Sequence, residues 1–521
     1  MDFQHPIIGN VKGLPAQDVT QFLGIKYASL GHWFDNAKLV EYDGKGLDAR
    51  RHGPQAISDP SGVHNEHFII QRALPTAEHP GISGTECLNL NIAVPQTSGA
   101  AQSLPVFVFI HGGAFITGSN WWPQYDLKRF VQLSVKQNKP IIAVNINYRL
   151  GAPGFLTSEE LRKAGFKSNQ GHHDQRVALQ WVKRYIAGFG GDPDKITLAG
   201  ESAGGISANR FLYSNEHAPS QIVVLGGSTP SLPPMDISAA EQTYQSALKA
   251  LNLNGGSPSQ KIESLSRLSP EDLGKLDQSL RLLPVVDEDT VPFVPSFKTV
   301  LSNRGISQDS PCKAIMVGYL PLDASIFGLA GLLQRQAGIA ASFITSIKSS
   351  LASHSDEASK LLSTYGINEG TKDEDALIQI LRFASDIGFQ APARSWVESF
   401  PADTFLLEFA EPNPWDGPFK GHSTHVLDVA FLFQNYNDHL DPSQRASAEA
   451  FAADIISFVR GEAPWKRFRD AEGFTVYQGG KRTYKEGSAA TSDQYRALLE
   501  ISETVGLDSL LEAWMKFFLP S

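Results

Sequence analysis

Short runs of consecutive apolar residues recur along the chain at spacings that suit buried strands. They lie at 106–110, 141–146, 196–199, 221–225, 314–317 and 405–409. Between two of these runs, residues 174–189 carry apolar side chains at helical spacing, namely Ala178, Trp181, Val182 and Tyr185. Strands that alternate with helices predict an α/β fold, with a mostly parallel central sheet and helices on both faces.

Between about 232 and 400 the pattern changes to helical, polar and Ser-rich segments, such as 342–364. Internal repeats and low-complexity tracts are absent from the sequence. We interpret these segments as helical excursions over the sheet and expect residues 1–521 to form one domain.

Composition excludes several classes of protein. Of the 521 residues, 41 % are hydrophobic and 19 % charged, which is typical of a globular chain. The formal net charge is −10, and an acidic surface repels phosphates, so a nucleic-acid partner is disfavoured. We expect no membrane span, because no apolar run reaches about 18 residues. The oligomeric state stays open.

The number of cysteines indicates the cellular compartment in which the protein is expected to reside. Cys87 and Cys312 are the two cysteines of the chain, too few for a disulfide framework. The sequence has no N-glycosylation sequon and does not open with a signal-peptide pattern. These features together predict a cytoplasmic location.

Residues 200–204 read Gly-Glu-Ser-Ala-Gly, which matches the nucleophile elbow G-x-S-x-G. The motif follows the predicted strand 196–199 and precedes a helical pattern at 205–213. Such a tight strand-to-helix turn holds the serine in strained backbone geometry and exposes its hydroxyl at the helix N-terminus. Ser202 is therefore the candidate nucleophile.

An acyl-transfer serine also needs donors for the developing oxyanion, and residues 111–115, His-Gly-Gly-Ala-Phe, directly follow the strand 106–110. Small residues there leave backbone N–H groups unobstructed. We expect an oxyanion hole formed by the N–H groups of Gly113, Ala114 and Ala203. A phosphate cradle is the alternative, but neither G-x-G-x-x-G nor G-K-[ST] is present.

Ordered motifs across most of the chain resemble the type-B carboxylesterases of the cholinesterase and fungal esterase/lipase family, which have the α/β-hydrolase fold. The matching segments are 22–28 (Phe-Leu-Gly-Ile-Lys-Tyr-Ala), 86–91 (Glu-Cys-Leu-Asn-Leu-Asn), 147–151, 169–171, 174–182, 189–193, the elbow, and 385–386 with Pro392. The resemblance implies carboxylic ester hydrolysis by a catalytic triad, with no cofactor.

The resemblance also places the other two triad residues. Residues 318–327 are similar to the family segment G-x-N-x-x-E-G-S-x-F, which puts Asp323 where the family usually has glutamate. Aspartate is one methylene shorter, so its backbone should lie closer to the histidine. His425 stands three residues before Asp428 and ahead of Phe431, as in the family pattern, whereas His422 does not fit. Val426 replaces the family glycine.

Other residues carry weaker expectations. His172 and His173 could suggest a metal site, but no third ligand is indicated, so we expect a solvated loop or helix cap and no metal. Glu201 could support His425 through a hydrogen bond or be purely structural. Six aromatic residues beside the motifs are candidates for the substrate pocket: Phe115, Trp121, Trp122, Phe327, Phe389 and Phe431.

We therefore expect a serine hydrolase that cleaves small-molecule carboxylic esters through an acyl-enzyme, with short-to-medium acyl or small aromatic esters as substrates. The short-chain preference rests on the absence of a long apolar lid-like helix from the sequence. An acyltransferase or a biosynthetic enzyme of secondary metabolism, using the same Ser-His-Asp site, is the alternative. A non-catalytic binding module is disfavoured because the triad is complete.

Cys87 yields one further expectation. In secreted members of the family this cysteine closes a flap through a disulfide with an upstream cysteine, whereas residues 51–56 here contain none. We expect two free thiols, and a flap at about 56–86 that is held only by packing and is less ordered than the sheet.

Overall fold

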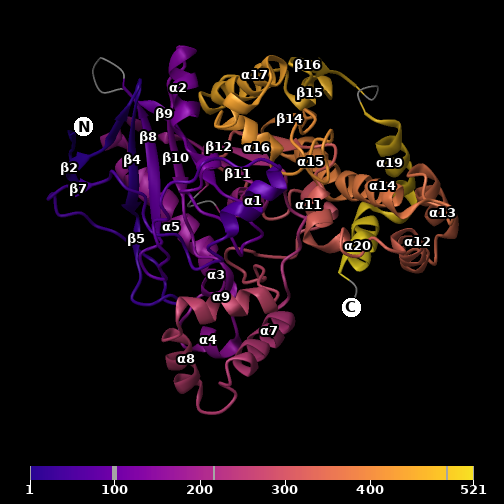
Figure 1. Ribbon diagram of the computed structural model, residues 1–521, viewed down its shortest axis with the longest axis horizontal. Coiled ribbons are helices and arrows are strands. Elements are labelled where there is room, and N and C mark those ends of the chain that lie inside the picture. Colours follow the sequence, from indigo (N-terminus) through magenta and orange to yellow (C-terminus); the bar gives the residue numbers. More distant parts are fainter. Residues whose placement is uncertain (1, 97–102, 215–217, 488–490, 520–521) are drawn as a thin grey trace.

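The computed structural model describes residues 2–96, 103–214, 218–487 and 491–519. Its centre is an eleven-stranded sheet with the order β16-β15-β14-β13-β12-β11-β9-β10-β8-β4-β3 (Figure 1). The strands are β3 (Leu14–Ala16), β4 (Val19–Lys26), β8 (Asn89–Pro95), β9 (Leu104–Ile110), β10 (Ile142–Ile146), β11 (Gly191–Glu201), β12 (Gln221–Leu225), β13 (Ala314–Tyr319), β14 (Asp403–Phe409), β15 (Phe474–Gln478) and β16 (Lys481–Lys485). All six expected strands lie within this sheet.

The central strands, from β10 across to β15, are parallel, and the outer pairs at both ends are antiparallel. The mostly parallel α/β-hydrolase sheet is thus confirmed. The register aligns the carboxyl ends of neighbouring strands: Gly200 lies opposite Ile110, and Leu225 opposite Gly318. The loops after β9, β11, β12 and β13 therefore leave the sheet at one edge, where ligands of open α/β sheets usually bind.

Each face of the sheet packs against helices. Along β9, Val106, Val108 and Ile110 join one hydrophobic cluster, whereas Phe107 and Phe109 join another. This alternation is the two-residue period of a strand that is buried on both faces. The first cluster includes residues of α5 (Gln170–Tyr185) and α6 (Ala203–Arg210), and the second includes residues of α2 (Lys128–Lys136), α16 (Leu427–Leu432) and α17 (Pro442–Val459).

Three of the helical segments after β12 lie away from the sheet. Helices α7 (Ile237–Ala250), α8 (Pro258–Ser266) and α9 (Pro270–Ser279) surround a hydrophobic cluster of their own with α3 (Gly151–Phe155) and α4 (Glu159–Lys163). They form the lobe at the bottom of Figure 1. A sheet face is already covered by α5 and α6, so these apolar stripes are buried against one another. The single-domain interpretation of residues 1–521 stays a prediction.

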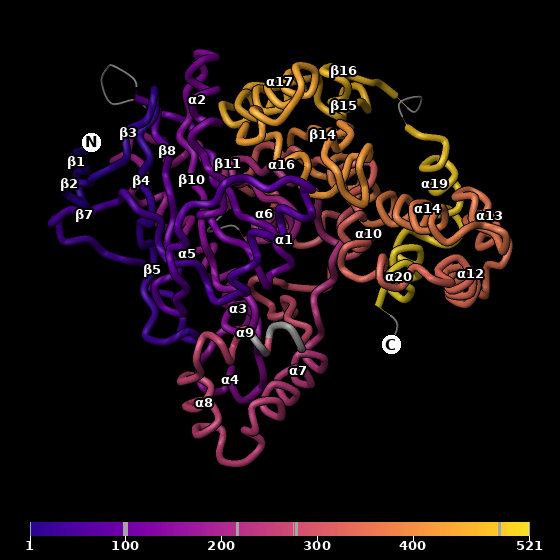
Figure 2. Tube along the Cα trace, in the orientation of Figure 1, coloured from indigo at the N-terminus to yellow at the C-terminus, as the bar shows by residue number. Residues whose placement is uncertain are grey.

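The other helices of the excursion lie on the opposite side of the molecule from the N-terminal strands. The expected helical segment 342–364 is two helices, α12 (Ile339–Ser350) and α13 (Ser355–Thr364), followed by α14 (Asp373–Ser385) and α15 (Ala391–Ser399). The last helices, α19 (Asp493–Val505) and α20 (Leu507–Phe518), pack back against α13 and α12 (Figure 2).

The flap at 56–86 contains one helix, α1 (Gly62–Ile70), and lacks a disulfide, because both cysteines are free and buried as expected. The expectation that packing alone holds the flap is wrong. Gln71 donates to the carbonyl of Trp415 and accepts from the N–H of Phe419, and Asn413 donates to the carbonyl of Ile70. These hydrogen bonds join the flap to the segment that precedes His425.

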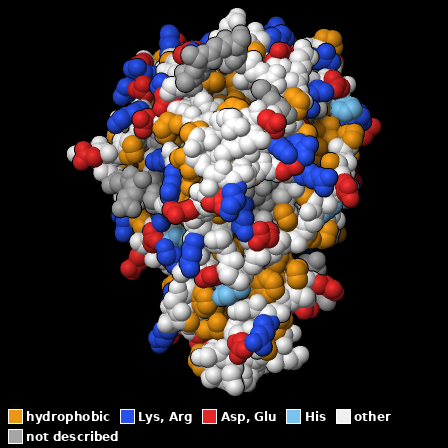
Figure 3. All heavy atoms as spheres, turned by 90° about the vertical axis from the view of Figure 1, so that its left-hand side faces the viewer, with side chains coloured by type: hydrophobic (Ala, Val, Ile, Leu, Met, Phe, Trp, Pro, Cys, Tyr) orange, Lys and Arg blue, Asp and Glu red, His pale blue; other side chains and the backbone are white. Residues whose placement is uncertain are grey.

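Across the described ranges, no helix is both long and apolar enough to cross a membrane. On the face that carries the N-terminal strands, basic and acidic side chains are interspersed (Figure 3).

Candidate active site

Ser202 lies in the turn between β11, which ends at Glu201, and α6, which begins at Ala203. Its backbone has φ 56° and ψ −124°, a strained conformation for a residue with a side chain. The neighbouring glycines are required by space: a Cβ on Gly200 would lie 2.1 Å from the Gly204 carbonyl oxygen, and one on Gly204 would lie 2.1 Å from that of Ile110. The sharp strand-to-helix turn expected from the motif is present, and Ser202 is half-buried at its tip.

The Gly-rich loop after β9 lies directly beside this serine. A Cβ on Gly112 would be 3.0 Å from Cβ of Ser202. Gly113, Ala114 and Phe115 all have positive φ, at 98°, 53° and 65°. Within the described ranges, the N–H groups of Gly113, Ala114 and Ala203 have no hydrogen-bond acceptor. Three free donors next to a hydroxyl suit the stabilisation of an oxyanion.

Asp323 and His425 form a buried pair. Nδ1 of His425 lies 2.6 Å from Oδ1 of Asp323, and both side chains are at most 3 % exposed. A bridge between Leu322 and Thr424 brings the two loops together, and the N–H of Leu322 donates to the carbonyl of Ser423. This close backbone approach compensates for the shorter side chain of aspartate.

The second oxygen of Asp323 accepts from the N–H of Leu320 at 3.0 Å, so the carboxylate is held on both sides. Val426, which follows the histidine, has φ 69°. Glycine adopts this left-handed conformation without strain, which explains why the family pattern has glycine at a position where this chain has valine.

Glu201 faces the other nitrogen of the imidazole. Its Oε1 lies 3.3 Å from Nε2 of His425, and no hydrogen bond within the described ranges joins His425 to Ser202. When Nδ1–H donates to Asp323, Nε2 carries a lone pair, so a favourable contact requires a proton on Glu201. Burial, followed by the charges of Glu66 and Asp428, raises the pKa of Glu201 well above its ordinary value, which favours this proton.

Two further buried carboxyl groups surround the site. Asp428, in the first turn of α16, accepts from the N–H of Val429, and burial together with the charge of Asp323 raises its pKa to about 7. Glu66, on the flap helix α1, accepts a hydrogen bond from the hydroxyl of Tyr125, and burial raises its pKa. Both shifts reduce the negative charge beside His425 below that of two carboxyl groups with ordinary pKa values.

Comparison with known proteins decides the family. The model of the carboxylesterase family matches residues 4–498. The chain belongs to the carboxylesterase family.

The relatives include lipases and esterases. Lipase 3 of Yarrowia lipolytica is 28 % identical over 494 residues, which cover 91 % of this chain and 90 % of that protein. A para-nitrobenzyl esterase of Bacillus subtilis is 32 % identical over 303 residues, which cover 55 % and 57 % of the two chains. A solved PNB esterase structure matches with a TM-score of 0.75 at 23 % identity, covering 96 % of this chain and 99 % of the other, and shows the fold. This carboxylesterase is thus a carboxylic ester hydrolase.

The candidate pocket aromatics of the carboxylesterase divide into three groups. Phe389 packs edge-on against the ring of His425 at 5.7 Å, and Phe327 lies 6.0 Å from Phe389. Phe115, in the oxyanion loop, is fully buried.

The remaining three lie elsewhere. Trp121 and Trp122 line a cavity of about 190 Å³ whose described lining includes none of the triad candidates. Phe431, which belongs to α16, packs in the second hydrophobic cluster, with its ring 5.2 Å from that of Phe409. Of the six, the structure thus places Phe389 against His425, Phe327 behind Phe389, and Phe115 in the Gly-rich loop after β9.

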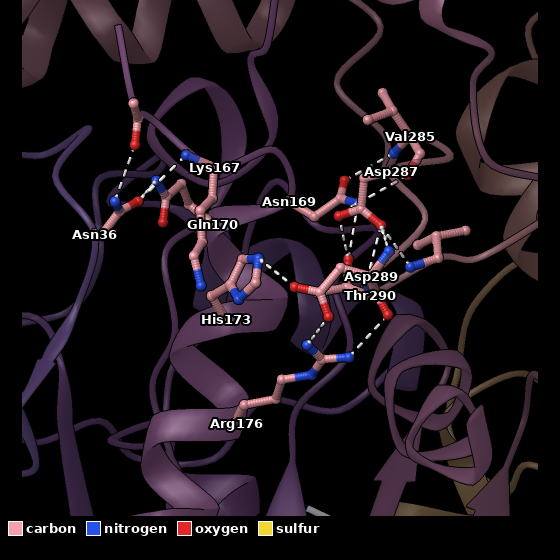
Figure 4. Close-up of polar contacts among 12 residues, drawn as sticks. Asn36, Lys167, Asn169, Gln170, His173, Arg176, Val285, Asp287, Asp289 and Thr290 are labelled. Atoms are coloured by element: carbon pink, nitrogen blue, oxygen red, sulfur yellow. Dashed lines mark hydrogen bonds and ion pairs between the residues drawn. The ribbon is translucent and has the colours of Figure 1, made fainter. Parts of the chain in front are cut away.

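His172 and His173 contradict the expected solvated loop. Both lie in the first turn of α5, which begins at residue 170, and they are only 4 % and 8 % exposed. His172 has partners in Gln175 of the same helix and in the distant Arg210, and His173 faces the distant Asp289. Figure 4 shows His173 and Arg176 directed at Asp289, and Asn169 at Asp287, so that the 285–290 loop is fastened to the start of α5. Within the described residues, no cluster of His, Cys, Asp or Glu could hold a metal ion.

Sequence patterns missed two parts of the site. Gly226 and Gly227 follow β12, and a Cβ on Gly227 would lie 3.2 Å from Cα of Ser202, so only glycine fits beneath the nucleophile turn. Their position directly after an expected strand could have indicated this. Glu66 and Tyr125 meet only because the flap folds onto the site, and no local signal predicts that contact.

Proposed function

We propose that Ser202 attacks the carbonyl carbon of a neutral ester while His425 takes the hydroxyl proton. Asp323 orients the imidazole and stabilises the imidazolium that forms. The N–H groups of Gly113, Ala114 and Ala203 hold the oxyanion. His425 then returns the proton to the leaving alcohol and activates water for hydrolysis of the acyl-enzyme.

The observation that carries this proposal is the buried Asp323–His425 pair, 2.6 Å apart, beside a strained serine and three unpaired N–H donors. His425 must move its Nε2 from Glu201 towards Ser202 when substrate binds. Catalytic hydrogen bonds commonly tighten in this way only in the substrate complex.

Ser202→Ala tests the mechanism. Removal of a nucleophile normally lowers kcat by about 10⁴-fold or more. The matched control is Ser220→Ala, at the opposite end of β12, which should leave turnover unchanged. Residual activity of Ser202→Ala within about tenfold of wild type would exclude an acyl-enzyme at this serine.

We further propose that the substrates have short-to-medium acyl chains or small aromatic groups. The flap helix α1 supports this, because it is not a long apolar lid. It has only nine residues, and its exposed face carries His64 and Asn65 beside Phe68. The relatives are named lipase and para-nitrobenzyl esterase, so they do not distinguish between long and short acyl chains for this protein. The test is kcat/KM for p-nitrophenyl esters from C2 to C16, with a maximum expected at C2 to C6; a maximum beyond C10 would contradict it.

Acyl transfer by the same site is the competing function. Added alcohol should not divert the acyl-enzyme from water if the protein is a hydrolase. If the transfer ester forms faster than the free acid, the protein is an acyltransferase and not a hydrolase.

We also propose a cytoplasmic location, supported by two unpaired thiols. Burial raises the pKa of both Cys87 and Cys312 to about 12, which keeps them protonated and unreactive.

A further inference from the structure

Arg210, at the last turn of α6, is a buried cation that forms no salt bridge with the described residues, although the charge of Asp287 acts on it from a greater distance. The residue is 5 % exposed, and neither Nε nor Nη2 has a hydrogen-bond partner among the described residues. In the part of the chain that the structure describes, no carboxylate lies within 4 Å of the guanidinium. Burial lowers its pKa to about 10, so Arg210 still carries its charge at neutral pH. A charge in this position is costly for folding, which calls for a function.

The single side-chain hydrogen bond of Arg210 starts a directional chain between α5 and α6. Nη1 donates to Nε2 of His172, whose Nδ1–H donates to Oε1 of Gln175 at 3.1 Å. Nε2 of Gln175 donates to the hydroxyl of Ser207 at 3.2 Å, and this hydroxyl donates to the carbonyl of Ala203 at 2.9 Å. The chain requires a neutral His172, and burial next to Arg210 lowers the pKa of that histidine well below its ordinary value.

Arg210 and His172 also hold the Gly-rich loop after β9, which carries Gly113, Ala114 and Phe115. The Phe115 ring lies 5.6 Å from His172 in an edge-on arrangement and 5.1 Å from Phe155, and Cζ of Arg210 lies 5.9 Å from its centroid. Phe115 follows Ala114, and both have left-handed backbones. Two successive non-glycine residues in this conformation persist only when their surroundings impose it.

Arg210 is thus connected, through other side chains, to both parts of the candidate oxyanion hole. One part is the loop of Gly113 and Ala114, reached through the Phe115 ring. The other is Ala203, at the start of α6, reached through Gln175 and Ser207. We propose that Arg210 is a positioning residue that aligns the three oxyanion donors and, through its buried positive charge, favours negative charge on the substrate oxygen. This inference rests on the proposed acyl-enzyme function.

The first test is Arg210→Met, which keeps the side-chain length and removes the charge. Replacement of a buried charge by an apolar residue is usually tolerated by the fold. Because removal of one oxyanion donor costs 10² to 10³ in kcat, misalignment of the hole should lower kcat by about 30-fold. KM should stay within about threefold. Arg210→Lys, which keeps the charge, should lose less, and Arg184→Met, on exposed α5 surface, should be unchanged.

Inhibition distinguishes positioning from a purely structural role. A trifluoromethyl ketone adds to Oγ of Ser202, its oxygen takes the negative charge, and His425 takes the proton. The Ki of this ketone should rise by the same factor as kcat falls in Arg210→Met, whereas the Ki of the corresponding alcohol, which forms no oxyanion, should not change. A structural role would lower the melting temperature and leave the ratio of the two Ki values unchanged.

Ser207→Ala interrupts the chain at its other end and serves as a second variant should Arg210→Met fail to fold. It should show a smaller loss, about three- to tenfold, with the same change in the Ki ratio. The inference would be overturned if Arg210→Met kept the wild-type kcat and the wild-type ratio of the two Ki values. If Arg210→Met is insoluble, the same result in both Ser207→Ala and Arg210→Lys would overturn it. A wild-type enzyme that the ketone does not inhibit would instead overturn the proposed function.

Discussion

Asp428 should make the stability of the protein fall as the pH rises through the neutral range. Its carboxyl is fully buried, Oδ2 has no hydrogen-bond partner, and burial together with the charge of Asp323 raises its pKa from 3.8 to about 7. The folded state therefore holds a proton that the unfolded state releases near pH 4. Full stability is present below that pH and is lost progressively as the pH approaches 7.

The magnitude follows from the difference between the two pKa values. A pKa of about 7 in place of 3.8 corresponds to about 4 kcal/mol of unfolding free energy. Between pH 5 and pH 8 the share of this one carboxyl is about 3 kcal/mol. Asp428→Asn removes the titrating proton and retains an oxygen that can accept from the N–H of Val429, so the variant should gain about 3 kcal/mol over wild type across that range.

Urea unfolding at pH 5, 6, 7 and 8, followed by tryptophan fluorescence, measures the effect. Asp416→Asn is the matched control, because the Asp416 side chain is 94 % exposed and should produce a curve parallel to wild type. If Asp428→Asn and wild type also differ by a constant amount at all four pH values, Asp428 is ionised in the native state and the reasoning fails.

Three further outcomes are expected. Gly204→Ala should inactivate the enzyme and destabilise it by more than about 3 kcal/mol, because its Cβ would meet the Ile110 carbonyl; wild-type melting and turnover would contradict this. Thiol titration in denaturant should find Cys87 and Cys312 reduced, with a melting temperature indifferent to dithiothreitol, and a fall of several degrees on reduction would show a disulfide. Hydrogen exchange should be faster in the flap at 56–86 than in the central strands, and equal protection would refute that expectation.

Sequence patterns predict a structural feature correctly when the residues that determine it are close together in the chain. The run at 106–110 predicts a buried parallel strand, since such strands are apolar on both faces, and β9 contains it. The turn at Ser202 was equally predictable, because its motif is local and a Cβ on Gly200 would meet the carbonyl oxygen of Gly204 in the same turn. The contact of Gly204 with Ile110 joins distant parts of the sequence and was not predictable from the motif alone. The placement of Asp323 and His425 came from family resemblance, and their contact depends on two loops that leave neighbouring strands.

Burial of polar residues was not predictable. The start of α5 reads as polar, yet Asp174 is fully buried because Arg149 binds it with two nitrogens at 2.7 and 2.8 Å. His172 is buried beside Arg210 in the same way. Such partners lie far apart in the sequence, so no local pattern indicates which polar residues the fold will enclose. The carboxyl groups of Glu66 and Asp428 around the site are a further example.

The row of aromatic rings beside His425 has a consequence for biosynthesis. Phe389 touches the imidazole, Phe327 touches Phe389, and Phe327 is in turn packed by Trp514 and Phe518 of α20, at 5.4 and 4.7 Å. The ribosome makes α20 after the serine, the aspartate and the histidine. A nascent chain that has already exposed all three reacting residues therefore still lacks the outer support of the wall behind its imidazole. We therefore expect ester cleavage to begin only once translation has passed this helix.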